Sequence, residues 1–105
     1  MMYRDEILEK IKASVASVVP EAELILYGSY ARREEKTESD IDVLILLDKE
    51  VISLEDEIKI AYPLYDIEYS TGIIISPLIL SKNEWEKRHR ITPFYENIQN
   101  EGVIL

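Results

Sequence analysis

Two aspartates, Asp40 and Asp42, open the otherwise apolar segment DIDVLILL. Side chains alternate along a β-strand, so both carboxylates would project from the same face, roughly 7 Å apart along the strand. Carboxylates held this close repel each other unless a cation lies between them. Mg²⁺ binds carboxylate oxygens together with substrate phosphates, so the pair predicts half of a magnesium–phosphate site. The alternative is a polar strand end that meets solvent.

A second feature, Gly28-Ser29, ends the preceding apolar segment AELILYG. Glycine can adopt a positive φ and let backbone N–H groups approach a ligand closely, and serine adds a hydroxyl donor. A short helix that begins here would direct its positive end toward an anion. If the two segments pair as antiparallel neighbours, the end of the first lies beside the start of the second. Phosphates would then be bound on one side of a crevice and their metal ions on the other.

The strands that position these residues are predicted from the apolar runs at 22–27, 40–48 and 72–80. The second run is apolar on both faces, which is typical of a central strand. Pro77 within the third run favours an edge position or a bulge. The linker between the first two runs is only about a dozen residues long, which favours an antiparallel pair over a helical crossover.

Helices are predicted around these strands. Residues 3–18 carry apolar side chains at helical spacing. Ser53 resembles the N-cap of a second helix, which Pro63 should kink or restart. Ser81 opens a further helix, and a short one follows near the C-terminus. The order of elements predicts a single α/β (α+β) domain over 1–105, with a small three-stranded mixed sheet flanked by helices.

Composition limits the kinds of partner. The net charge of −9 comes from 21 acidic and 12 basic residues, so no extended nucleic-acid surface is expected. There is no cysteine, which excludes disulfides and thiolate metal sites. The sequence shows no apolar signal core and no run of roughly 20 apolar residues. We therefore expect a cytoplasmic protein that does not associate with a membrane.

The sequence as a whole resembles a known family. Gly28-Ser29, ten intervening residues and Asp40-Ile41-Asp42 resemble the signature of the DNA polymerase β-like nucleotidyltransferase superfamily. The stretch YGSYARREEKTESDIDVLILL is most similar to the minimal nucleotidyltransferase (MNT) proteins. The resemblance covers most of the chain and implies the nucleotidyltransferase fold. It also implies transfer of a nucleoside monophosphate from a nucleoside triphosphate, with ATP as the expected donor, to a hydroxyl.

The same resemblance assigns roles to five residues. It implies that Asp40 and Asp42 are catalytic and bind two Mg²⁺ ions, one activating the attacking oxygen and one stabilising the leaving oxygen. Gly28 and Ser29 would hold the β- and γ-phosphates. Arg32 would pair with the triphosphate or with pyrophosphate, since guanidinium groups bind phosphate oxygens bidentately. The alternative for Arg32 is a solvated loop arginine.

One expected group is missing, and its absence leaves two functions open. Active members of the superfamily usually carry a third carboxylate on the next core strand, whereas GIIISPLIL contains no acid. Asp66 and Glu68, just upstream, are the candidates for this third carboxylate. The first function is a nucleotidyltransferase and the second is a non-catalytic nucleotide- or partner-binding module of the same fold. Because MNT proteins often act as antitoxins, the resemblance also implies a HEPN-domain partner. A homo-oligomer stays open.

Overall fold

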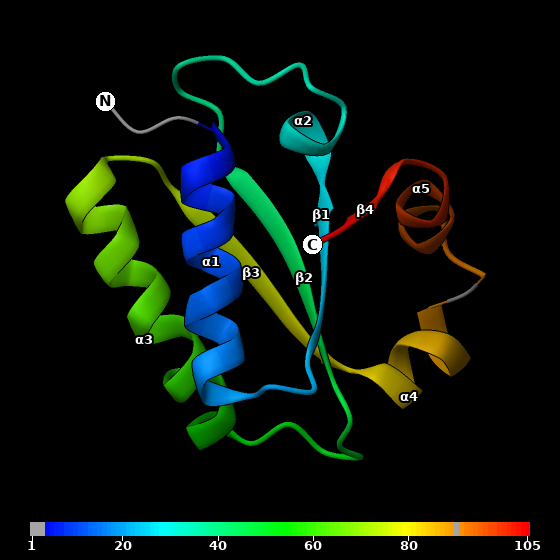
Figure 1. Ribbon diagram of the computed structural model, residues 1–105. Coiled ribbons are helices and arrows are strands. Elements are labelled where there is room, and N and C mark those ends of the chain that lie inside the picture. The colour runs from blue at the N-terminus through cyan, green and yellow to red at the C-terminus, as the bar shows by residue number, and fades with distance from the viewer. Residues whose placement is uncertain (1–3, 90) are drawn as a thin grey trace.

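The computed structural model describes residues 4–89 and 91–105 (Figure 1). Its elements are α1 (Arg4–Val18), β1 (Glu23–Tyr27), α2 (Gly28–Ala31), β2 (Ile41–Leu47), α3 (Leu54–Thr71), β3 (Ile75–Ser81), α4 (Lys82–Glu84), the π-helical turn η1 (Trp85–His89), α5 (Pro93–Glu101) and β4 (Val103–Ile104). The predicted α/β class is confirmed. No helix in this described part of the chain combines the length and the apolar character needed to cross a membrane.

The strands form one mixed sheet in the order β3-β2-β1-β4. Strands β1 and β2 are antiparallel neighbours, as predicted, and β2 runs parallel to β3. The segment predicted as the central strand is indeed internal, and Pro77 lies in an edge strand. The sheet has one strand more than predicted, because β4 pairs with the outer edge of β1 over only two residues.

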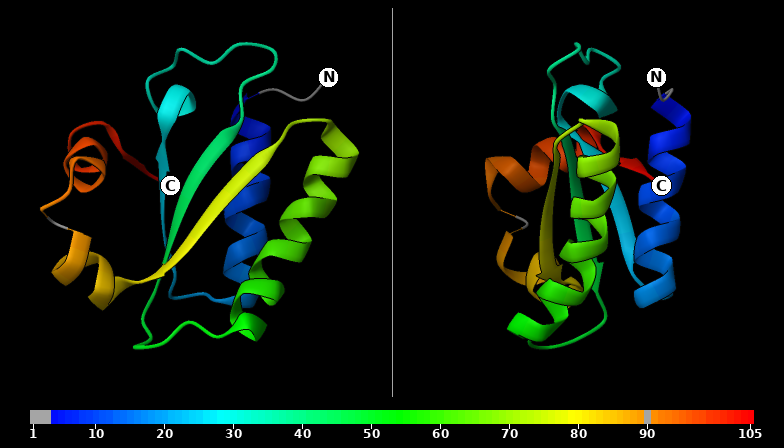
Figure 2. Two further views of the ribbon diagram at one scale, coloured as in Figure 1. Left: turned by 180° about the vertical axis from the view of Figure 1, so that it is seen from behind. Right: turned by 90° about the vertical axis from the view of Figure 1, so that its left-hand side faces the viewer.

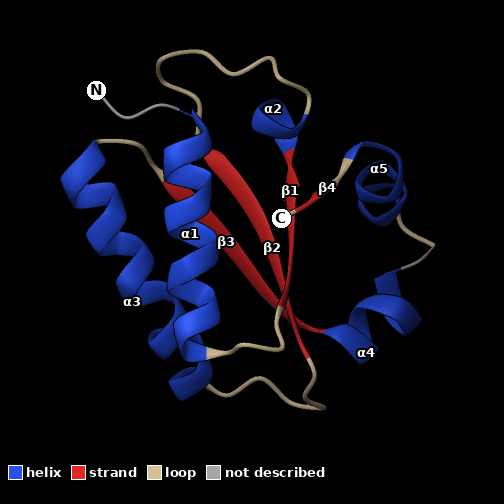
Figure 3. Cartoon of the chain, in the orientation of Figure 1, coloured by secondary structure: helices blue, strands red, loops and turns tan. Residues whose placement is uncertain are grey.

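Helices cover both faces of this sheet (Figures 2 and 3). The larger core lies between the sheet and the pair α1 and α3, and β2 contributes its odd-numbered residues to it. The smaller core lies on the opposite face, where even-numbered residues of β2 pack around fully buried Trp85 and around Ile98 of α5. Since side chains alternate along β2, Asp42 belongs to this second face, at the end of the sheet where α2 begins.

Helix α3 corrects one prediction. Pro63 was expected to kink or restart the helix, and it does not restart it, because one helix runs from Leu54 to Thr71 with Pro63 inside it. Proline removes one backbone hydrogen bond from a helix. On either side of it, Ile60 and Leu64 are almost completely buried in the larger core, so packing keeps both sides of Pro63 in one helix. The predicted N-cap is confirmed, since Ser53 forms a reciprocal capping box.

Candidate active site

The candidate site lies where β1 ends and β2 begins. In the antiparallel register Tyr27 is paired with Asp42, so the next residue, Gly28, passes directly over the Asp42 carboxylate. Gly28 has φ +72°, a conformation that only glycine adopts without strain. A Cβ placed on Gly28 would overlap Asp42 Oδ2 and lie 3.3 Å from Asp42 Cγ. The glycine is therefore required both by the turn and by the close approach of the carboxylate.

The short helix α2 begins at Gly28, with Ser29 as its second residue. The first N–H groups of a helix have no partner within the helix. The side chain of the N-cap residue, Tyr27, accepts no capping hydrogen bond. The predicted helix start is thus present, and it lies beside the carboxylate of Asp42.

The loop from α2 to β2 is tied to the first helix. Arg4 Nη1 donates a hydrogen bond to Glu35 Oε1 at 2.8 Å. The Arg4 guanidinium also lies over the ring of Tyr30, 5.6 Å from its centroid. These contacts fasten the loop that separates Gly28 from Asp40, and so help to fix the two halves of the site relative to each other.

Asp42 is an electrostatically strained carboxylate. Its partial burial raises its pKa above the ordinary value, and the negative charge of Asp40 raises it further. The positive charge of Arg32 acts in the opposite direction. The structure therefore brings these three predicted site residues within electrostatic range of one another. A bound cation would relieve the repulsion between the two carboxylates.

The donor set fits a hard divalent cation. Asp40, which is exposed, and half-buried Asp42 offer carboxylate oxygens from one end of β2. Over residues 4–89 and 91–105 there is no group of three or more His, Cys, Asp or Glu side chains arranged to hold a metal. Mg²⁺ suits such a pair, because it commonly takes one or two protein carboxylates and completes its shell with water and substrate phosphates.

Arg32 follows α2 and is held loosely. Its Nε lies 3.2 Å from Glu34 Oε1, and its Nη1 lies 3.5 Å from Glu101 Oε2 at the end of α5. All three side chains are substantially exposed, and ion pairs of this kind contribute little to stability. Arg32 can therefore exchange these partners for a phosphate at little cost.

Comparison with known proteins identifies the family. Residues 8–105 match the sequence model of a protein family that is described as "Nucleotidyltransferase domain". The chain belongs to this nucleotidyltransferase family. The predicted resemblance is thereby confirmed, and the protein is a nucleotidyltransferase.

Two relatives of the nucleotidyltransferase come from Methanocaldococcus jannaschii. "Putative protein adenylyltransferase MJ0141" is 37% identical over 103 residues, covering 93% of this chain and 94% of the relative. "Putative protein adenylyltransferase MJ0604" is 33% identical over 85 residues, covering 78% of this chain and 75% of the relative. A crystal structure described as a "putative nucleotidyltransferase" from Sulfolobus solfataricus matches with a TM-score of 0.55 and 21% identity, over 93% of this chain and 75% of the other. This last likeness concerns the fold.

The position beside Asp42 on the next strand is occupied by Ser76. The two residues are register partners in the parallel pair β2–β3, so their side chains lie on the same face of the sheet. The nucleotidyltransferase thus has a hydroxyl where an additional carboxylate would stand closest to Asp42. The alternation of side chains along the third apolar run indicates that residues 74 and 76 share one face of the strand. Which of them lies beside Asp42 depends on the register of β2 with β3, which the structure shows.

Glu68 lies on the other side of β3. Its Oε1 accepts a hydrogen bond from the N–H of Ile75 at 2.7 Å. The carbonyl of the same peptide group, Ile74 O, accepts from Ile41 N at 2.8 Å, so it points toward β2. In a trans peptide the C=O and N–H point in opposite directions. The Glu68 carboxylate is therefore bound at the outer edge of β3, away from Asp42, and Asp66 is exposed on α3.

Tyr27, the aromatic residue before Gly28 in the stretch that carries the family resemblance, is also a neighbour of the site. Burial raises the pKa of its phenol, and the nearby charge of Asp42 raises it further. The ring packs edge-to-face against Phe94 of α5, with the ring centroids 5.4 Å apart. Phe94 in turn packs edge-to-face on Trp85 at 5.8 Å. The smaller core therefore supports the face of the sheet on which Asp42 lies.

Proposed function

We propose that this nucleotidyltransferase is a Mg²⁺-dependent protein adenylyltransferase, which transfers AMP from ATP to a hydroxyl of a partner protein. The observation that carries the proposal is the contact between Gly28 and Asp42, because it joins a phosphate-binding turn to a carboxylate pair. The names of the two relatives from M. jannaschii support a protein as the acceptor.

In this proposal the chain contributes two binding surfaces. Asp40 and Asp42 hold two Mg²⁺ ions, and the N–H groups and hydroxyl at Gly28-Ser29 bind the β- and γ-phosphates. Arg32 leaves its two exposed glutamates and pairs with the same phosphates. Bound Mg²⁺ supplies charge compensation for the phosphates and lowers the pKa of the attacking hydroxyl.

The transfer is an in-line displacement at the α-phosphorus. The acceptor oxygen forms a bond to the α-phosphorus, and the bond from that phosphorus to the oxygen that bridges it to the β-phosphate breaks. Pyrophosphate leaves with the bonding electron pair, and the hydroxyl proton passes to solvent. Positioning and electrostatic stabilisation provide most of the catalysis in reactions of this type.

The partner we propose is a HEPN-domain protein encoded nearby, with this chain acting as its MNT-type antitoxin. An acidic chain is poorly suited to nucleic acid as an acceptor, since its net charge is −9. Nucleic acid would need a basic binding surface, whereas a hydroxyl on a protein does not. Adenylylation of that hydroxyl would then be the means of neutralising the partner.

A second candidate function is a nucleotide-binding module without catalysis. It is favoured by one observation, the presence of Ser76 instead of an acid beside Asp42. Without a further carboxylate, the ion that activates the acceptor has one protein ligand fewer. Such a module would neutralise its partner by occlusion and leave it unmodified.

One labelling experiment distinguishes the protein adenylyltransferase from the nucleotide-binding module. The chain is incubated with Mg²⁺, ATP labelled at the α-phosphate, and the protein encoded by the neighbouring gene. We expect label on that protein, lost in Asp42→Asn and retained in Asp48→Asn, a control at an exposed position just past the opposite end of β2. If ATP is bound but no label appears on the partner, the adenylyltransferase is refuted and the binding module remains.

A further inference from the structure

An exposed apolar stripe runs along α3. The stripe consists of one leucine, one isoleucine and three tyrosines at spacings of three and four residues: Leu54, Ile58, Tyr62, Tyr65 and Tyr69. Residues at these spacings lie on one side of a helix. Tyr62 is 63% exposed and Tyr69 is 95% exposed, while the core residues Ile60 and Leu64 of the same helix are buried. Helix α3 is therefore apolar on two sides, and only one of them is covered.

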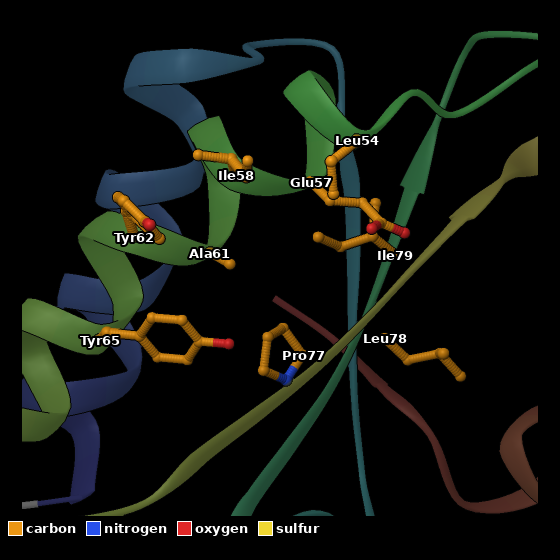
Figure 4. A pocket seen from close by; sticks show the side chains of 9 residues that line it. All are labelled: Leu54, Glu57, Ile58, Ala61, Tyr62, Tyr65, Pro77, Leu78 and Ile79. Atoms are coloured by element: carbon orange, nitrogen blue, oxygen red, sulfur yellow. The ribbon is translucent and has the colours of Figure 1, made fainter.

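The stripe borders a groove of about 330 Å³ between α3 and the edge strand β3 (Figure 4). Ile58, Tyr62 and Tyr65 contribute to one wall. Pro77 and Ile79 contribute to the other wall, and the ring of Tyr65 points toward Pro77. An exposed apolar surface of this extent, rimmed by polar residues, is typical of an interaction site.

The edge of β3 that borders the groove offers few backbone donors for strand pairing. Along β3, the backbone groups of odd-numbered residues point away from β2, as the hydrogen bond from Ile41 N to Ile74 O establishes. Of these outward donors, the N–H of Ile75 is already bound by Glu68, and Pro77 has none. An added strand would find few donors, so the surface favours a partner that binds through side chains.

The charges around the stripe indicate the chemistry of that partner. Glu55, Glu57 and Asp66 are exposed on α3, and the single lysine of this helix, Lys59, is paired with Glu55 at 3.1 Å. A second copy of this chain, with its net charge of −9, would bring the same acids face to face. Complementary charge at an interface favours association, and like charges oppose it. A basic partner is therefore favoured over a homodimer.

We propose that the α3 stripe and its groove form a docking site for an amphipathic helix of a partner protein, with an apolar face flanked by lysine and arginine. An apolar helical face that lies in a hydrophobic groove is a recurrent mode of recognition. The four-turn length of the stripe matches such a helix. The site lies at the outer edge of β3, on the side away from Asp42, so docking does not depend on nucleotide or on the proposed transfer.

The first test uses designed helical peptides and the whole chain. One 18-residue peptide carries leucines at helical spacing flanked by lysines. A second replaces the lysines by glutamates, and a third keeps the lysines but scatters the leucines. We expect fluorescence anisotropy to show that the first peptide binds at least tenfold more tightly than the other two. No binding of the first peptide, or equal binding of all three, would overturn the proposal.

Surface variants then locate the site. Ile58→Glu and Tyr62→Glu should each weaken binding of the first peptide at least tenfold. Tyr62 is 63% exposed, so Tyr62→Glu should keep the parent melting temperature, whereas Ile58 is 39% exposed and Ile58→Glu is compared at a temperature where it is folded. Ile91→Glu, at an 87% exposed position outside the stripe, is the matched control and should bind as the parent does. Asp42→Asn should also bind normally, which separates docking from catalysis. Unchanged binding in Ile58→Glu and Tyr62→Glu, or a parent dimer that these variants dissociate, would refute the proposal.

Discussion

Replacing Gly28 by alanine tests whether the turn and the carboxylate act as one unit. Two glycines have nearly the same positive φ, +72° at Gly28 and +76° at Gly72. In either, a Cβ in this conformation costs about 1–2 kcal/mol. A Cβ on Gly72 meets nothing within 4 Å, whereas a Cβ on Gly28 overlaps Asp42 Oδ2. Gly72→Ala is therefore a control that carries the backbone strain without the collision.

The size of the effect follows from that collision. To reach an ordinary contact distance, the Asp42 carboxylate must move by about 1 Å. A misplacement of about 1 Å in a catalytic group can lower a rate by roughly 100-fold. We expect Gly28→Ala to lose about two orders of magnitude in transfer rate, while Gly72→Ala keeps the parent rate. Urea unfolding should show a loss of stability in both variants, at least as large in Gly28→Ala as in Gly72→Ala, because only Gly28→Ala adds the collision.

Single-turnover measurements with ATP labelled at the α-phosphate provide the assay for these variants. Gly28→Ala and Gly72→Ala should be compared at a temperature at which urea unfolding curves show that both variants are folded in the absence of urea. If Gly28→Ala transfers as fast as the parent, Gly28 is an ordinary turn residue and its contact with Asp42 has no catalytic role. If Gly72→Ala loses as much activity as Gly28→Ala, backbone strain alone explains the loss.

Three further predictions concern single carboxylates. Ser76→Asp places an acid beside Asp42 and should raise the transfer rate in Mg²⁺ by about tenfold or more, because a carboxylate there can assist proton transfer. An unchanged transfer rate would mean that no further acid is needed. Asp42→Asn should have a melting temperature at least as high as that of the parent in EDTA at pH 7, because the raised pKa means that ionised Asp42 opposes folding. Any difference in melting temperature should vanish at a pH low enough to protonate Asp42 in the parent. The hydrogen bonds from Lys49 and Ser53 lower the pKa of Asp56 from 3.8 to about 2. The stabilisation from Asp56 should therefore be complete above about pH 4 and lost toward pH 2, so that urea titrations of parent and Asp56→Ala converge at low pH.

Local patterns predicted the centre of the fold well. The segment 40–48 is apolar on both faces, and in the structure its odd and even residues enter the two separate cores. The short linker before it correctly indicated an antiparallel neighbour. Both features depend on residues that are close in sequence, which is why the pattern alone was sufficient.

Features set by distant contacts were predicted less well. Strand β4 is only two residues long, and it is a strand because β1 lies beside it. Pro63 remains inside a helix because packing on both sides of it outweighs one lost hydrogen bond. In neither case does the local sequence contain the deciding interaction, since each depends on a partner elsewhere in the chain.

The candidate site shows the same division. The contact of Gly28 with Asp42 follows from strand pairing that the sequence predicted. The identity of the residue beside Asp42 on β3 depends on the exact parallel register, which spacing does not determine. The side of β3 on which Glu68 is bound depends on the direction of one peptide group. Such orientation is visible only in three dimensions.

The pairing of β1 with β4 has a consequence during synthesis. Ile25 pairs with Ile104, and Leu24 O accepts a hydrogen bond from Leu105 N at 3.0 Å, so the two partners leave the ribosome at very different times. The chain emerges from the ribosome with its N-terminal side first. Until residues 103–105 emerge, the outer edge of β1 is an open template for another strand. Slow or interrupted translation just before residues 103–105 should therefore favour association between nascent chains on the same message.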